Sequence, residues 1–316
     1  MKASIKPGII LPWLMIAVAF LIPAITSNSF YQALFIVTFI WIIVNQGFNI
    51  ILGYTGYCSL VQGGLYGTAA YITAILTTAY GTSPWVAALV AVCAVTVLSL
   101  LLGLVVFRTY GQFFAILTLV MGLALYELFK NLEITGRDVG IAGVPSLLPA
   151  SWPAVSYYYL VLLIMLGAVA FALWLRKTRL GYALRGIGAN EKLAASVGIS
   201  LYKYKIAALV LASVYSGIGG VLYAYYMNFV SPEPFSVTAS LYMLLAVVIG
   251  GTGTIAGPIV GSFLLVFLPA WMQELEAYQL TIYGLVVILM IRFMPRGLVS
   301  IGSYVKGTSP AESAGR

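Results

Sequence analysis

Residues that could carry out chemistry are scarce in this sequence. There is no histidine, and the two cysteines, Cys58 and Cys93, lie inside apolar runs. These facts disfavour His-dependent catalysis, a His/Cys metal site and a disulfide framework. No G-x-x-x-x-G-K-[ST] phosphate loop occurs, and the apolar runs hold no paired carboxylates. We therefore expect no catalytic residue, no metal site and no cofactor in this chain. An enzyme subunit or a membrane scaffold is a third functional class, and no residue favours it.

One stretch is chemically rich, namely residues 176–205. It holds seven of the 16 Lys and Arg residues of the chain and a single acid, Glu191. Each Lys or Arg costs roughly 2.5–3.5 kcal/mol in hydrocarbon, so this segment is expected to be a cytoplasmic loop in water. The seven basic residues are Arg176, Lys177, Arg179, Arg185, Lys192, Lys203 and Lys205.

Two short amphipathic helices are predicted inside this loop. Thr178 can cap the first, whose apolar positions recur at i, i+4 and i+7. Asn190 can cap the second, Glu191 suits its positive end, and Gly198 can end it in the left-handed conformation. Such a pair is typical of a docking surface for a soluble partner. The alternative interpretation is a basic loop that lies on anionic lipid.

The composition predicts an all-α, polytopic membrane protein. Hydrophobic residues make up 62% of the 316 residues, charged residues 8%, and the mean hydropathy is +1.04. The net charge of +8 comes from loop Lys and Arg residues, which orient the chain in the bilayer, so nucleic acid is not expected as a partner. We treat residues 1–316 as a single membrane domain with a disordered tail at 303–316.

Ten apolar runs are long enough to be candidate spans across roughly 30 Å of hydrocarbon. If Lys2 and Lys6 lie in the cytoplasm and each span reverses the side of the membrane, the positive-inside rule places both ends of the chain in the cytoplasm. The Gly-rich junction near residue 252 could instead be a re-entrant turn. The candidate spans are 9–27, 30–52, 58–79, 85–107, 112–130, 157–175, 205–228, 237–251, 255–271 and 278–294.

The spans are almost free of charge, and this bears on energy coupling. No charged residue occurs between Lys6 and Arg108. Carriers driven by ion gradients usually place ionisable groups near the membrane midplane, so an ion-coupled or passive carrier is the less favoured alternative. An uncharged interior rich in Gly, Thr, Ser and Tyr suits a small neutral or zwitterionic solute.

Small residues form two patterns. Stripes at every fourth position predict close helix packing: Ala208, Ala212, Ser216, Gly220 and Ala224, then Gly253, Gly257 and Gly261. A G-x-T-G-x7-G pattern also occurs twice, starting at Gly53 and at Gly250, and indicates repeated broken-helix elements. Chance is a competing explanation, because glycine is common here. These glycines and their polar neighbours are our candidates for a solute path or gate: Gly53, Thr55, Gly56, Tyr57, Gln62, Gly250, Gly251, Thr252 and Gly253.

Several ordered blocks resemble the permease subunits of hydrophobic, branched-chain amino acid ABC importers, the LivM-type half. They are FRTYGQFFAILTL, TGRDVGIAGVP, RLGYALRGIGANEKLAASVGIS, YAYYMNFVSPEPFSVTASLYMLLAVVIGGTGTIAGPIVGSFLL and RFMPRGL, within about residues 45–302. The resemblance implies a multi-pass protein of the bacterial inner membrane. It implies alternating access driven by one or two cytoplasmic ATPase subunits that hold ATP and Mg, with a second related permease, membrane lipid around the bundle and a periplasmic or lipoprotein solute-binding protein.

By this resemblance, Glu191, Ala194, Ala195 and Gly198 form a coupling helix that seats on the ATPase, with Arg185 and Asn190 in the same loop. Arg137, Asp138 and Glu233 are candidate contacts for the solute-binding protein. The sequence departs from the family where a Gln and a Ser-Leu-Gly-His run usually follow LGYTG, because Tyr57–Gln62 stand there. Tyr182 and Gly188 also stand where basic residues are common, which predicts either a weaker pairing with the ATPase or different contacts with it. The identity of the solute stays open.

Overall fold

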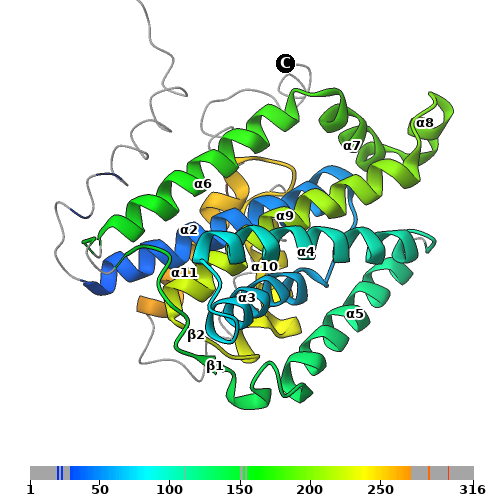
Figure 1. Cartoon of the computed structure of the whole chain (residues 1–316). Coiled ribbons are helices and arrows are strands. Elements are labelled where there is room, and N and C mark those ends of the chain that lie inside the picture. Colours follow the sequence, from blue (N-terminus) through cyan, green and yellow to red (C-terminus); the bar gives the residue numbers. More distant parts are fainter. Residues whose placement is uncertain are drawn as a thin grey trace, which may run out of the picture.

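The computed structural model describes residues 29–109, 111–149, 152–153 and 155–271, with the isolated positions 20, 23, 284 and 298. It is a helical bundle (Figure 1). Its main helices are α2 (Ser29–Asn49), α3 (Gln62–Thr78), α4 (Pro84–Val106), α5 (Gln112–Asn131), α6 (Val155–Arg176), α7 (Arg179–Ala189), α8 (Glu191–Ser196), α9 (Leu201–Met227), α10 (Val237–Gly250) and α11 (Ala256–Trp271). Short elements join them: the π-helical turn η1 (Ile50–Tyr54), the 3-10 turns η2 (Arg137–Val139) and η3 (Glu233–Phe235), and the strands β1 (Ile141–Ala142) and β2 (Phe229–Val230).

Five helices in the described part of the chain are long and apolar enough to cross a membrane: Ser29–Tyr54, Pro84–Val106, Gln112–Asn131, Val155–Arg176 and Leu201–Met227. Each coincides with an expected span. Helices α3, α10 and α11 coincide with three more, but they are shorter, with 17, 14 and 16 residues. The expected spans 9–27 and 278–294 and the tail 303–316 lie outside the described residues, apart from positions 20, 23 and 284. The count of ten spans and the side of each terminus therefore stay predictions.

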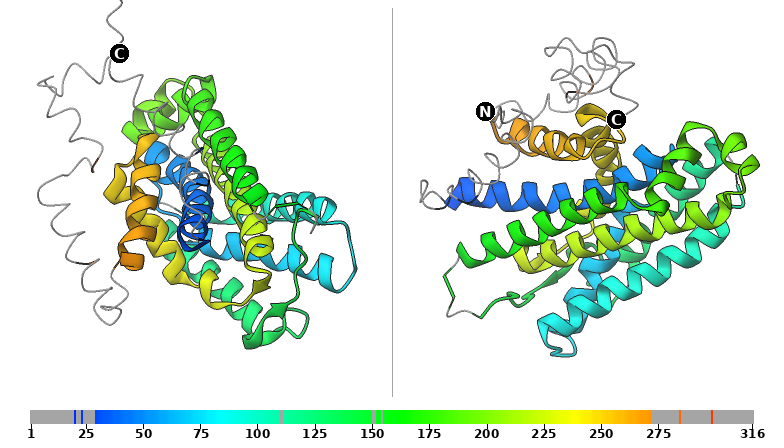
Figure 2. Two further views of the ribbon diagram at one scale, coloured as in Figure 1. Left: turned by 90° about the vertical axis from the view of Figure 1, so that its left-hand side faces the viewer. Right: turned by 90° about the horizontal axis from the view of Figure 1, so that it is seen from above.

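Helix α9 lies at the centre of the bundle and packs against α2, α3 and α4, and the long helices run side by side (Figure 2). All five residues of its small-residue stripe are buried, which confirms the predicted close packing. A Cβ at Gly220 would collide with the backbone carbonyl of Tyr66, and one at Gly219 with the side chain of Val44. Because a larger residue would not fit, the glycines let three helices meet at backbone distance.

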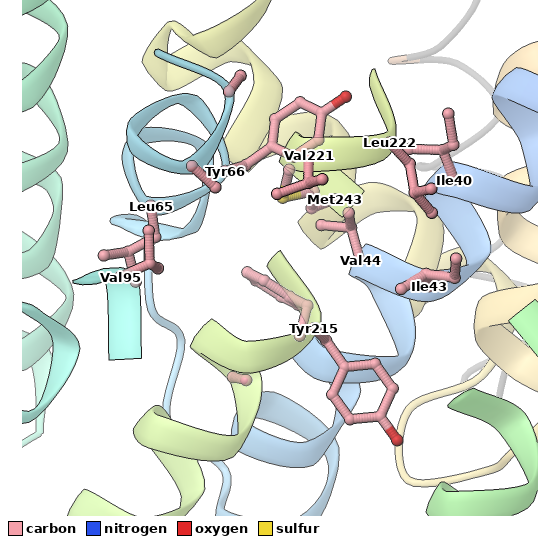
Figure 3. Close-up of a cluster of buried hydrophobic side chains, with 14 of the residues drawn as sticks. Ile40, Ile43, Val44, Leu65, Tyr66, Val95, Tyr215, Val221, Leu222 and Met243 are labelled. Carbon is pink, nitrogen blue, oxygen red and sulfur yellow. The ribbon is translucent and has the colours of Figure 1, made fainter. Parts of the chain in front are cut away.

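Aliphatic and aromatic side chains fill the space around α9. Figure 3 shows Ile40, Ile43 and Val44 of α2 close to Val221 and Leu222 of α9, with contributions from α3, α4 and α10. These side chains belong to one hydrophobic cluster that runs through most of the described helices. The helices therefore share a core rather than forming separate bundles.

Helices α10 and α11 form an antiparallel hairpin that packs along α2. A Cβ at Gly250 would collide with the Gly257 carbonyl, and a Cβ at Gly261 with that of Ala246. Gly257 and Gly261 of the predicted stripe therefore do bring two helices together, whereas Gly253 lies before α11, in the turn. The chain turns between them at residues 251–255, where Gly251 and Gly253 have φ values of 124° and 73°. Only glycine adopts such values without strain.

Candidate functional site

Residues 176–205, the basic segment, contain the two predicted helices, α7 and α8, at one end of the bundle (Figure 1). The Thr178 hydroxyl accepts a hydrogen bond from the Gly181 N–H at 3.2 Å. The Asn190 side chain accepts one from the Leu193 N–H at 3.1 Å. Gly198 follows α8 with φ 87°. The capping signals read from the sequence are thus confirmed, because they depend only on neighbours along the chain.

Part of this segment faces outward and is apolar. Tyr182, Leu193 and Val197 are 63%, 63% and 70% exposed, while Leu184 and Ala194 turn toward the bundle and are buried. Of the other predicted coupling residues, Ala195 and Gly198 are exposed. An ordered helix whose apolar side chains face away from the bundle is a surface suited to a partner.

Arg185 is committed to its own segment. Its guanidinium donates to the Gly181 carbonyl at 3.3 Å and to the Arg176 carbonyl at 2.9 Å, and it lies 4.8 Å from the centre of the Tyr182 ring. These contacts join the end of α6 to α7. Arg185 therefore shapes the segment as well as contributing charge.

Lys205 departs from the expectation of a fully hydrated segment, because only 4% of this residue is exposed. Its ammonium lies 2.9 Å from a carboxylate oxygen of Glu191 and donates to the Tyr57 hydroxyl at 2.6 Å. A buried ammonium is tolerated when a carboxylate and hydrogen-bond acceptors surround it. Lys205 thus links the predicted coupling helix to Tyr57, a predicted path residue.

Tyr57 lies in the break between η1 and α3. Gly56 begins the break with φ 76°, so the expected span at 58–79 becomes a helix only from Gln62. The Tyr57 ring packs edge-on against Phe107 and Phe114, at centroid distances of 5.8 and 4.9 Å. One aromatic ring therefore fixes the break against the turn between α4 and α5.

The two G-x-T-G motifs lie against each other. A Cβ at Gly53 would collide with the backbone nitrogen of Gly253 and would lie 2.8 Å from its Cα. Thr55 is buried and its hydroxyl donates to the Ile51 carbonyl at 2.5 Å, whereas Thr252 is exposed. The repeated pattern thus marks two helix breaks that meet, although their threonines differ in environment.

A row of amide side chains on α2 holds the second break, at residues 251–255, in place. This row was not predicted from the sequence. Asn49 donates to the Thr254 carbonyl at 2.8 Å and accepts from the Gly253 N–H at 2.8 Å. Gln46 donates to the Ile255 carbonyl at 2.7 Å, and Asn45 donates to the Ser262 hydroxyl at 2.8 Å. Polar residues inside an apolar run are expensive in a membrane, so this cluster was a signal available in the sequence.

The basic segment touches the first break directly. A Cβ at Gly188 in α7 would collide with the Tyr54 carbonyl oxygen and would lie 3.0 Å from the carbonyl carbon. Tyr54 ends the π-helical turn. Such turns are rare in proteins overall, and those that occur are often at functional sites. Gly188 therefore allows α7 to pack closely on the backbone of this turn.

A cavity of about 620 Å³ opens beside these elements. Its volume lies within the range of roughly 300–1,000 Å³ that is typical of small-molecule sites. It lies between the break at Thr55–Cys58, the start of α5 and the junction of α7 with α8. Gln62 lies deeper. Its amide oxygen accepts from the Ser216 hydroxyl at 2.8 Å, and its amide nitrogen has no hydrogen-bond partner among the described residues. The predicted path residues therefore form two groups, one at the cavity and one at the meeting of the two breaks, and Gln62 belongs to neither.

The predicted contacts for a binding protein lie away from α7 and α8, where β1 pairs with β2 (Figure 1). Arg137 forms an ion pair with Glu133, and Asp138 lies 3.4 Å from the Lys130 ammonium. Glu233 accepts from the Tyr126 hydroxyl at 3.3 Å. All three predicted residues are exposed. The two loops that carry them are joined by the strand pair.

In the part of the chain that the structure describes, no group of three or more Cys, Asp or Glu residues is placed to hold a metal ion. What the site offers is mechanical: an outward-facing helix, a buried ion pair and glycine contacts between helix breaks.

The sequence family described as "Branched-chain amino acid transport system / permease component" matches residues 30–293. The chain belongs to this family.

Relatives agree with that assignment. The high-affinity branched-chain amino acid transport system permease protein LivM of Escherichia coli K12 is 28% identical over 89% of this chain and 78% of its own length. The LivM protein of Salmonella typhimurium LT2 gives the same values. The nucleoside ABC transporter permease NupC of Lactococcus lactis is 43% identical, but over only 18% of each chain. No solved structure matches significantly. This permease is accordingly a multi-pass inner-membrane subunit of an ABC importer.

Proposed function

We propose that this permease moves branched-chain amino acids, or similar small neutral or zwitterionic solutes, by alternating access driven by separate ATPase subunits. The observation that carries the proposal is the contact of α7 with the first helix break. Gly188 leaves no gap between α7 and the Tyr54 backbone, and Gly53 leaves none between that break and Gly253. A displacement of the basic segment therefore reaches the meeting point of both breaks through backbone contacts.

The ATPase is proposed to bind the outward face of α8. Leu193 and Val197 supply exposed apolar area, and the ordered helix requires no folding on binding. A partner subunit would hold ATP and Mg, since this chain has no phosphate-binding loop. On this proposal the permease has no ATPase activity of its own.

The β1–β2 end is proposed to receive the solute-binding protein. Arg137 and Asp138 are exposed and already held by Glu133 and Lys130, so their charges are positioned before a partner arrives. Glu233 adds a second loop to the same surface. A second, related permease would complete the pathway, as in transporters whose access changes at the interface of two halves.

The solute class rests on the interior and the relatives. Between Lys6 and Arg108 the chain carries no charge, so a solute with a net charge would find no counter-ion there. LivM proteins are named for branched-chain amino acids, and a shorter match is named for nucleosides. Branched-chain amino acids are therefore the first candidates, and the binding protein is expected to set the final selectivity.

Reconstitution tests the proposal. The permease would be expressed with a partner ATPase, a second permease and a solute-binding protein, and the complex purified into liposomes. We expect uptake of radiolabelled leucine that needs ATP and the binding protein and is unaffected by ionophores. Uptake by this chain alone that ionophores abolish would contradict the proposal and favour a secondary carrier.

A further inference from the structure

Lys205 is the most unusual charge in the described part of the chain. Three ion pairs occur there, and two of them, Lys130–Asp138 and Arg137–Glu133, involve side chains that are 34–83% exposed. The Lys205 side chain is 5% exposed and pairs with a Glu191 side chain that is 35% exposed. Lys205 also lies near the positive N-terminal end of α9, where a cation gains nothing from the helix dipole. Its position therefore serves its contacts rather than the stability of α9.

These contacts join elements that are distant in sequence. Glu191 is the first residue of α8, Lys205 belongs to α9, and Tyr57 lies in the break before α3. Through Tyr57 the group reaches Phe107, which follows α4, and Phe114 in the first turn of α5. One ammonium therefore connects the proposed ATPase-binding helix to the break and to the α4–α5 turn.

The open cavity beside this group gives it room to move. Tyr57 and Glu191 both line it, together with Gly56, Gly111 and Asn190. Gly56 and Gly111 have φ values of 76° and 59° and would meet nothing within 4 Å if they carried a Cβ. The cavity side of these two glycines is therefore open, while the Tyr57 ring packs on Phe107 and Phe114 and Lys205 joins it to α8.

We propose that Lys205 is a positioning residue that couples the position of the break at Tyr57 to the position of α8. A buried ammonium loses stabilisation if its carboxylate is withdrawn, so Glu191, Lys205 and Tyr57 move as a unit. When a bound ATPase displaces α8, this unit carries the break with it. The inference rests on the proposed function and adds a named route by which ATPase movement reaches the path.

The test is the amount of solute carried per ATP hydrolysed in the reconstituted importer. Lys205→Met removes the charge and keeps most of the stem. We expect this variant to bind the ATPase and hydrolyse ATP while solute carried per ATP falls by about fivefold or more. Lys203→Met, an exposed lysine two residues away in the same helix, is the matched control and should behave as the wild type.

A double charge reversal separates coupling from stability. Glu191→Lys combined with Lys205→Glu restores an opposite pair, and the Tyr57 hydroxyl can then donate to the new carboxylate. The reversal should recover most of the coupling that each single change loses. Tyr57→Phe removes only the hydroxyl and keeps the ring against Phe107 and Phe114, and it too should lower solute carried per ATP. If Lys205→Met fails to insert into the membrane, Tyr57→Phe serves as the test in its place.

Two results would overturn the inference. One is a Lys205→Met importer, or a Tyr57→Phe importer where the former does not insert, that carries wild-type amounts of solute per ATP. The other is a proportional loss of ATPase binding, hydrolysis and uptake in Lys205→Met, which would place its effect at the ATPase contact. Failure of the proposed function is distinguishable, because the wild-type complex would then show no ATP-dependent uptake at all.

Discussion

Replacing Gly188 by alanine should force α7 away from the π-helical turn beneath it. The added Cβ would lie 3.0 Å from the Tyr54 carbonyl carbon and 3.3 Å from that of Thr55, with the Tyr54 oxygen closer still. Carbon atoms in good contact are about 3.5–4.0 Å apart, so α7 must withdraw by roughly 0.5–1 Å. Overpacking of this kind costs about 1–3 kcal/mol.

Gly186 provides the matched control for this change. It lies in the same helix, and a Cβ there would meet only the Ile199 side chain, at 3.9 Å. Alanine is better than glycine in a helix by about 0.5–1 kcal/mol, and this gain is shared by both variants. Gly186→Ala should therefore be neutral or stabilising, whereas Gly188→Ala should be less stable than Gly186→Ala by about 1–3 kcal/mol.

Thermal unfolding of the two purified variants in detergent measures the difference, and ATP-dependent uptake by the reconstituted importer measures its consequence. We expect a lower Tm and less solute carried per ATP for Gly188→Ala only. If Gly188→Ala unfolds at the same temperature as Gly186→Ala and transports normally, the close packing of α7 on η1 is not what connects the basic segment to the break.

Three further changes test other parts of the argument. Gly53→Ala should destabilise the protein by about 1–3 kcal/mol, because its Cβ would lie 2.8 Å from the Cα of Gly253 in the α10–α11 turn. The control Gly167→Ala should not destabilise it, since a Cβ there meets nothing within 4 Å. Equal Tm values for the two variants would contradict the contact. Leu193→Asp should reduce co-purification of the ATPase by about tenfold or more, whereas Val139→Asp, at the β1–β2 end, should leave it unchanged; retention by both would exclude α8 as the docking helix. With the second cysteine replaced, Cys58 should react with a membrane-impermeant maleimide only from the cytoplasmic side, and labelling from outside would reverse the predicted topology.

The features that the sequence predicts well are those set by near neighbours. Thr178, Asn190 and Gly198 end or begin their helices as expected, because a cap depends on residues within one turn. The apolar runs likewise match the described helices, since hydrocarbon requires length and hydrophobicity and little else. The stripe on α9 is confirmed for the same reason: spacing alone places small residues on one face.

Contacts between distant segments could not be read in this way. Lys205 looks like one more loop cation, and its burial depends on Tyr57, which lies 148 residues away. The repeated G-x-T-G pattern identifies two breaks, but nothing in a repeat states that its copies touch. Asn49 has no local partner to reveal its hydrogen bonds with the second break. Such information depends on tertiary packing, which a single sequence does not display.

The two kinds of contact at the basic segment have complementary mechanical properties. Gly188 against the Tyr54 backbone resists compression, because van der Waals repulsion rises steeply when atoms approach, but it offers little resistance to separation. The Glu191–Lys205 pair resists separation, because withdrawing the carboxylate takes a negative charge away from a buried ammonium. A transport cycle requires the path to follow the ATPase in both directions. A segment held by a backbone contact and by a buried ion pair can push the first break in one half of the cycle and pull it back in the other, whereas either contact alone would transmit only one of the two movements.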